Sequence, residues 1–187
     1  MRAVTRAAEG FDRRALTVSE VLRMQEIEII AADERYELVG GEIVPCPRNA
    51  HKHELIKSAL IIGIVRALPQ TLWFGAATTL YVRDDTLFET DIVVFPRSVS
   101  FKNLGPRTAS LVIEVTGPNR SYDLEFKPRL YARHKFPALW VVDSETRVTQ
   151  KLSAPEGQSW REREEIKPDE ALTHPLLPSF SLRLSDF

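Results

Sequence analysis

The sequence predicts a single α/β domain of mixed α+β character, in which a mixed β-sheet lies between helices. Segments with helical periodicity alternate with short apolar segments typical of strands, in the order helix, hairpin, helix, strands, helix and strand. The chain has 187 residues, 43% of them hydrophobic and 27% charged, which is enough for one core without disulfides or a structural metal. This composition excludes a disordered, collagen-like or coiled-coil protein.

The chain begins with a predicted helix and a predicted hairpin. Thr17 and Glu20 form the capping-box pattern of a helix that we expect to extend to about residue 31. Residues 36–39 and 42–44 are two short alternating segments around a Gly-Gly pair, which is typical of a tight β-hairpin.

A long helix is expected after the hairpin, at about residues 52–68, and its apolar residues cover enough of its surface to predict central packing. The segments that follow predict strands at 72–74, 78–82, 90–95 and 111–116, a helix at 123–135, and a pair of strands at 139–143 and 147–152. The polar stretch 153–170 predicts loops, and residues 175–178 predict an extended segment over the core.

Charge and cysteine content limit the classes of partner and compartment. The net charge is -1, so any nucleic-acid binding must come from a local basic patch. The single cysteine, Cys46, cannot form an internal disulfide and is interpreted as a small hydrophobic residue. No apolar run is long enough to span a membrane, and we expect a cytoplasmic protein without a membrane partner. Residues 1–15 are expected to form a flexible arm before one domain at 16–187.

Two acidic residues lie in strongly apolar segments. Asp91 stands near the start of residues 90–95, and Glu114 stands within residues 111–116. A buried carboxylate is costly unless it is paired, protonated or bound to a metal. On an edge strand, however, Glu114 would face water, and Asp91 would be a turn residue if the strand began there. If the two strands are neighbours, both carboxylates can face one point, and such oxygen ligands suit Mg²⁺ or Mn²⁺.

A lysine on the following helix completes a candidate site. Lys127 shares one helix face with Leu124 and Tyr131, so it should point toward the sheet, although a lysine can also extend to water at a helix edge. Pro128 either distorts the first turn of this helix or lies in the first turn of a helix that begins near Lys127. In the candidate site two carboxylates hold a cation, and the lysine orients water and offsets negative charge.

Basic side chains surround the same helix. A positive rim beside an acidic metal site would suit a phosphate backbone, although a solvated helix face has the same composition. The candidate nucleic-acid-binding residues are Arg120, Arg129 and Arg133.

These motifs resemble, in order, those of the "putative restriction endonuclease" family, which belongs to the PD-(D/E)XK nuclease superfamily. The resemblance is carried by residues 36–38, 41–43, 53–56, 91–94, 114–118, 123–133, 140–143 and 175–178. It implies a restriction-endonuclease-like core with the order αβββαβ, preceded here by an N-terminal helix and hairpin. Thr90 stands where the family usually has proline, and no lysine stands two residues after Glu114.

The resemblance also implies an activity: Mg²⁺-dependent hydrolysis of DNA phosphodiester bonds, with Mn²⁺ as an alternative metal. Asp91 and Glu114 would be the metal carboxylates, and Lys127 the active-site lysine, moved from the strand to the helix. Additional candidates for the site are Glu37, His53 and Asp123. RNA or a nucleotide is an alternative substrate, and a homodimer is an expected assembly for cutting two strands. The alternative function is a catalytically inactive module that binds nucleic acid or protein and retains the nuclease fold.

Overall fold

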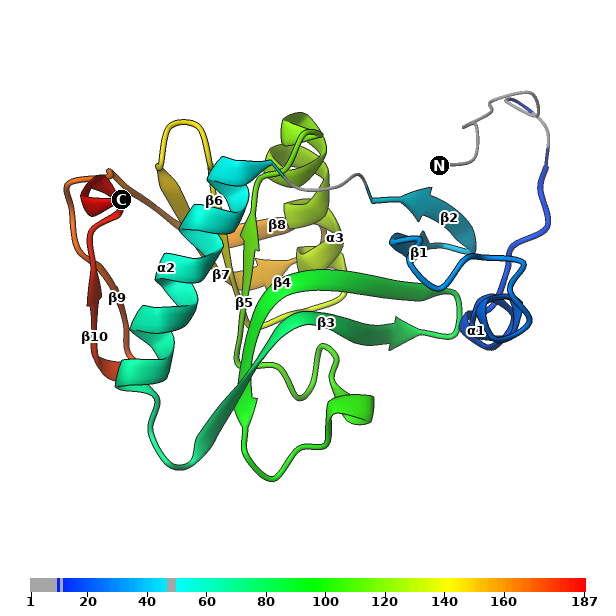
Figure 1. The fold of residues 1–187 in the computed structure, drawn as a ribbon, viewed down its shortest axis with the longest axis horizontal. Coiled ribbons are helices and arrows are strands. Elements are labelled where there is room, and N and C mark those ends of the chain that lie inside the picture. The colour runs from blue at the N-terminus through cyan, green and yellow to red at the C-terminus, as the bar shows by residue number, and fades with distance from the viewer. Residues whose placement is uncertain (1–9, 11, 47–49) are drawn as a thin grey trace.

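A mixed β-sheet forms the centre of the molecule in the computed structural model, which describes residues 10, 12–46 and 50–187. Helix α2 (His51–Ala67) covers one face of this sheet and helix α3 (Lys127–Arg133) covers the other (Figure 1). The predicted fold class is therefore confirmed. The predicted N-terminal arm falls largely on residues 1–9 and 11, which lie outside the described residues.

The sheet has the strand order β2-β1-β4-β5-β6-β7-β8, and β3 pairs with β4 beside this path. All of these pairs are antiparallel except β5 with β6. A parallel pair requires a crossover connection, and here that connection contains α3. The strands are β1 (Tyr36–Val39), β2 (Glu42–Pro45), β3 (Leu72–Arg83), β4 (Thr86–Pro96), β5 (Leu111–Val115), β6 (Ala138–Val142), β7 (Thr149–Glu156) and β8 (Ser159–Ile166).

The N-terminal elements agree with the sequence in kind, but the helix is shorter than predicted. Helix α1 (Val18–Glu26) begins at the capping box of Thr17. It ends before residue 31 because Glu28 takes a left-handed backbone conformation with φ 61°, which closes the helix. The β1–β2 hairpin is confirmed, and Gly40 and Gly41 both have positive φ, as a type I′ turn requires.

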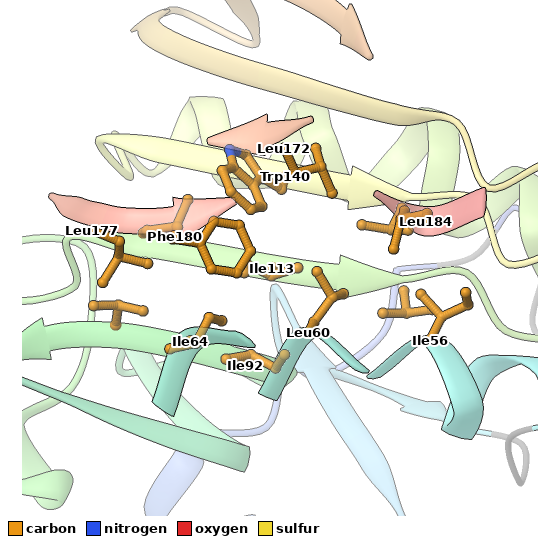
Figure 2. Packing of buried hydrophobic residues seen from close by; sticks show 14 of the residues in the cluster. Ile56, Leu60, Ile64, Ile92, Ile113, Trp140, Leu172, Leu177, Phe180 and Leu184 are labelled. Carbon is orange, nitrogen blue, oxygen red and sulfur yellow. The ribbon is translucent and has the colours of Figure 1, made fainter. Parts of the chain in front are cut away.

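Helix α2 packs against the middle of the sheet, as predicted. Ile56, Leu60 and Ile64 recur on one side of the helix and meet a group of buried side chains from the sheet (Figure 2). The predicted extended segment at residues 175–178 belongs to a separate two-stranded sheet, made of β9 (Leu172–His174) and β10 (Leu177–Leu182). Phe180 of β10 packs into the same core.

Two strand predictions were wrong. Residues 72–74 and 78–82 form one continuous strand, β3, because pairing with β4 carries the backbone through the small residues between them. The stretch 153–170 contains the end of β7 and all of β8 instead of loops. Its charged side chains face water from the last strand of the sheet, so the apolar alternation that identifies a strand is weak there.

None of the helices in the described part of the chain is long and apolar enough to cross a membrane.

Candidate active site

The carboxylates of Asp91 and Glu114 project from two adjacent strands. Ile92 of β4 lies opposite Ile113 of β5, so the next step of this antiparallel register brings Asp91 opposite Glu114. Side chains opposite each other point to one face of a sheet, and this face packs against α3. Asp91 is 6% exposed and Glu114 2% exposed.

The alternative interpretations of these two acids were wrong. Strand β5 lies between β4 and β6, so Glu114 is not on an edge strand. Asp91 lies within the long strand β4 and not in a turn at its start.

Lys127 reaches the carboxylates from the beginning of α3. A π-helical turn at Tyr122–Phe126 precedes this helix, and the backbone N–H of Lys127 donates to the carbonyl of Tyr122. Pro128 then lies in the first turn, where its missing N–H costs little. The interpretation that the helix begins near Lys127, with Pro128 in its first turn, is therefore correct. The side chain of Lys127 is buried and does not extend to water.

The ammonium group of Lys127 lies between two carboxylates. Its Nζ is 3.1 Å from Oε1 of Glu37 and 3.2 Å from Oε2 of Glu114. It is also 3.9 Å from Oδ1 of Asp123. Burial disfavours the charged form of Lys127, but the neighbouring carboxylates outweigh it and raise its pKa well above the ordinary value.

The hairpin contributes Glu37, a third buried carboxylate. Strand β1 pairs with β4, and this pairing places Glu37 beside the other acids with no exposed surface. Its Oε1 also accepts the backbone N–H of Glu89 at 3.3 Å, and its Oε2 accepts the hydroxyl of Tyr122 at 3.1 Å. Both oxygens of Glu37 are therefore occupied by groups of the protein.

Asp91 is held by two hydrogen bonds on one oxygen. Its Oδ2 lies 3.0 Å from Nε2 of His53 and accepts the backbone N–H of Val115 at 2.9 Å. Burial raises the pKa of Asp91, but the bonds from His53 and Val115 outweigh it, and the pKa lies below its ordinary value. Asp91 is thus ionised at neutral pH, and its other oxygen, Oδ1, has Lys57 at 4.0 Å.

Glu114 is bound by groups from α3 on both of its oxygens. The hydroxyl of Tyr131 donates to Oε1 at 2.5 Å, while Lys127 lies on the Oε2 side. Burial raises the pKa of Glu114 to about 8, and Lys127 opposes this shift while Asp91 and Glu37 add to it. Because burial penalises the ionised form of this carboxyl group, a nearby positive charge stabilises that form strongly.

Asp123, an additional candidate from the sequence, lies at the same site. It is part of the π-helical turn, and its Oδ2 accepts the backbone N–H of Gly117 at 2.7 Å. Burial raises the pKa of Asp123, with Lys127 and Gly117 opposing the shift.

All of these carboxylates line one cavity with a volume of about 80 Å³. The cavity also contains groups that sequence reasoning missed, notably Arg35 and Tyr122. Arg35 stands two residues before Glu37, so strand alternation would have placed it on the same face. Within the described part of the chain, the Arg35 side chain is half-buried and has no hydrogen bond or ion pair.

Cys46 also lines the cavity. Burial, with a contribution from Glu37, raises the pKa of its thiol to about 12. The thiol is therefore uncharged at neutral pH, which fits the interpretation of Cys46 as a small hydrophobic residue.

The structure does not bring the predicted nucleic-acid-binding arginines into this cavity. The guanidinium of Arg120 pairs with Asp143, with Nε 3.1 Å from Oδ1. Arg129 and Arg133 are exposed on α3 and line two other hollows of the surface.

The donor set fits a hard divalent cation held by two carboxylates. Glu37, Asp91, Glu114 and Asp123 line the cavity, and Lys127 pairs with all of them except Asp91, which His53 binds. Mg²⁺ is typically bound by one or two carboxylates and completes its shell with water and phosphate oxygens. No group of three or more His, Cys, Asp or Glu side chains among the described residues is arranged to hold a metal ion. The two carboxylates that adjacent strands bring opposite each other are those of Asp91 and Glu114.

A family model described as "Putative restriction endonuclease" (Uma2) matches residues 18–185 of the chain. The chain belongs to this family. The Uma2 family is the one that the sequence motifs resemble, so that resemblance is confirmed.

The fold of this chain is similar to that of a solved structure. It is similar to a "putative nuclease belonging to DUF820" from Anabaena variabilis ATCC 29413, with a TM-score of 0.70 and 21% sequence identity. The match covers 91% of this chain and 96% of that chain. No curated protein matches the sequence.

Proposed function

We propose that the chain is a metal-dependent endonuclease that hydrolyses phosphodiester bonds of DNA, with its active site in the cavity of Asp91, Glu114 and Lys127. The observation that supports this most is the pair of buried carboxylates on adjacent strands, one of which, Glu114, is paired with the buried Lys127. Membership of the Uma2 family supports a nuclease. DNA, rather than RNA or a nucleotide, is the substrate proposed here.

Asp91 and Glu114 would hold the cation, which we propose to be Mg²⁺, with Mn²⁺ as the alternative. A bound divalent cation supplies charge stabilisation at the phosphate oxygens and lowers the pKa of a bound water. His53 and the N–H of Val115 keep Asp91 ionised and fixed in position. Tyr131 fixes Glu114 from the opposite side of the site.

Lys127 and Arg35 are the lysine and the arginine that line the cavity and can face the substrate there. Lys127 is buried at the carboxylates, where an ammonium group can orient a water molecule and offset charge that develops on the phosphate. The guanidinium of Arg35 has no hydrogen bond or ion pair with the described residues, and the oxygens of nearby Glu37 are bound by Lys127 and Tyr122. A half-buried arginine in this condition can bind a phosphate group at the mouth of the cavity.

Cleavage of DNA by the wild type and by Asp91→Asn tests the proposal. Supercoiled plasmid and single-stranded DNA are incubated with Mg²⁺ or Mn²⁺, and Asp186→Asn, an exposed aspartate, serves as the matched control. We expect metal-dependent cutting by the wild type and the control, and a loss of at least roughly 100-fold in Asp91→Asn. Equal cutting by both variants would contradict the assignment of the site.

The remaining outcomes separate the alternatives. Cutting of RNA but not DNA under the same conditions would reject the proposed substrate. DNA binding without cutting by the wild type would favour the inactive binding module. A homodimer and a cytoplasmic location stay predictions.

A further inference from the structure

A second surface feature, which shares no lining residue with the acidic cavity, gathers positive charge. Three separate segments line a hollow of about 450 Å³: the end of β3, the β4–β5 connection and the end of α3. Four of the residues that line it are basic, and none is acidic. We call it the basic hollow, and its cations are Arg83, Arg107, Arg133 and Lys135.

The loop that carries Arg107 is fixed against β3. The backbone N–H of Tyr81 donates to the carbonyl of Leu104 at 2.8 Å. At Gly105 the backbones approach so closely that an added Cβ would lie 2.4 Å from the carbonyl oxygen of Tyr81. Thr108 closes the loop, since its hydroxyl donates to the carbonyl of Asn103 at 2.8 Å. The backbone of this loop, the green connection after β4 in Figure 1, is therefore held against β3.

The end of α3 is also fixed. Lys135 has φ 61°, a left-handed conformation that usually favours glycine, and it closes the helix through a bond from its N–H to the carbonyl of Ala132 at 2.9 Å. This closure sets Lys135 beside Arg133 at the opposite end of α3 from Lys127.

The positive charge of the basic hollow is largely unpaired within the described residues. Arg83 pairs with Asp85, whose Oδ1 is 3.8 Å from Nε of Arg83. Arg107, Arg133 and Lys135 have no ion pair there. Burial, Arg133 and Arg83 together lower the pKa of His134, which also lines the hollow. Converging like charges repel, so an anion that binds among them relieves a cost of the folded protein.

We propose that the basic hollow binds phosphate groups of a nucleic-acid backbone, as an anchor separate from the acidic cavity. Arginine presents a planar donor fork that matches phosphate, and three of the four cations are arginines. This inference rests on the proposed function for the identity of the polyanion. Because the hollow lies at the far end of α3 from Lys127, it would hold backbone at a distance from the bond that is cut.

The experiment measures binding of a fluorescent 20-base-pair DNA duplex by anisotropy, in EDTA and over a range of salt concentrations. The test variant is Arg107→Ala/Arg133→Ala, and the matched control is Arg66→Ala/Arg161→Ala, which removes the same charge from exposed positions outside the hollow. None of these four arginines forms an ion pair with a described residue. Melting temperatures verify that both variants fold. Each lost phosphate contact lowers the slope of log K against log salt by about 0.9.

We expect the test variant to bind more weakly with a slope lower by about 1.8, and the control to bind as the wild type does. Equal binding by both variants, or no binding by the wild type, would overturn the inference. Competition by millimolar inorganic phosphate as effective as that by unlabelled DNA would identify a site for free phosphate, and equal competition by polyglutamate would identify an acidic peptide. Either result would overturn it.

The same binding experiment separates this inference from the proposed function, because it requires no cleavage. If Asp91→Asn and the wild type both fail to cut DNA, but the hollow variant still lowers binding, the proposed function fails and the anchor stands. If DNA is cut but the hollow variant binds normally, the anchor fails alone.

Discussion

Glu114 receives both of its side-chain partners from one turn of α3. Lys127 and Tyr131 are four residues apart, so they project from the same helix face, one above the other. Each takes one oxygen of the carboxylate. The orientation of Glu114 is therefore set by this helix.

Tyr131→Phe tests the positioning of Glu114. The ring should keep its place, since it packs against Phe136 at 4.8 Å and Phe88 at 5.1 Å between centroids. Loss of the hydroxyl leaves one oxygen of Glu114 without its donor, and we expect metal affinity and the rate of cleavage to fall roughly 10- to 100-fold. The KM for DNA should change little, because Tyr131 does not face the substrate.

The control for this prediction is Tyr36→Phe. Tyr36 also loses a hydrogen bond, from its hydroxyl to Oε1 of Gln25 at 3.2 Å, but it lies outside the cavity. Similar losses of metal affinity in the two variants, or a purely thermal effect of Tyr131→Phe, would show that the hydroxyl does not position Glu114.

At the scale of single residues, the sequence indicated the buried acids of the cavity more clearly than the other side chains that line it. Asp91 and Glu114 interrupt apolar segments, and such an interruption is visible without a structure. Tyr122 gives no such signal, because its role depends on a contact with Glu37, far away in the chain. Arg35 was missed because its lack of an ion pair among the described residues depends on the tertiary contacts of the site and not on the local sequence.

Among the elements, β8 supports the site although it contributes no residue to the cavity. Trp160 of β8 is buried, and its Nε1 donates to the carbonyl of Pro128 at 2.9 Å. Pro128 follows Lys127 directly, so this bond ties the first turn of α3 to the edge of the sheet. Strand β8 was missed in the sequence because its charged residues face water, and only Trp160 and Ile166 are buried.

Trp160→Phe tests this link between β8 and α3. The substitution keeps an aromatic ring but leaves a buried carbonyl without its donor, which costs about 1–3 kcal/mol in the free energy of unfolding. We expect a lower melting temperature and a weaker cleavage activity, measured by calorimetry and by the plasmid assay.

Trp73→Phe provides the comparison for that substitution. Trp73 is 39% exposed, and its ring stacks under the guanidinium of Arg97. Trp73→Phe should therefore change the melting temperature much less than Trp160→Phe does. Equal melting temperatures for Trp160→Phe and the wild type would mean that the bond to Pro128 contributes nothing to stability.

For the whole molecule, the sheet order explains why residues so far apart in the chain form one site. Strand β4 lies between β1 and β5, so it brings the hairpin, with Glu37, beside the strand of Glu114. The parallel pair β5–β6 then places α3 over the same face. The sequence predicted the elements and the fold class from local periodicity, but this strand order depends on long-range pairing that periodicity does not encode.

Charge is also distributed unevenly over the whole molecule. The net charge is only -1, yet the acidic cavity and the basic hollow carry opposite excess charge at the two ends of α3. Average composition hides this separation, because a local patch is formed by folding and not by sequence order. Under the two proposals, this separation would let the basic hollow hold a nucleic-acid backbone while a cation in the acidic cavity contacts a phosphate elsewhere along it.

Binding of Mn²⁺ by the metal-free protein, followed by electron paramagnetic resonance, tests the central claim most directly. The wild type is compared with Asp91→Asn, Glu114→Gln and the control Asp186→Asn. We predict a Mn²⁺ site in the wild type and the control that is lost in both cavity variants, because each removes one of the carboxylates that would hold the ion. Unchanged Mn²⁺ binding in the two cavity variants would contradict the claim that Asp91 and Glu114 form a metal-dependent active site.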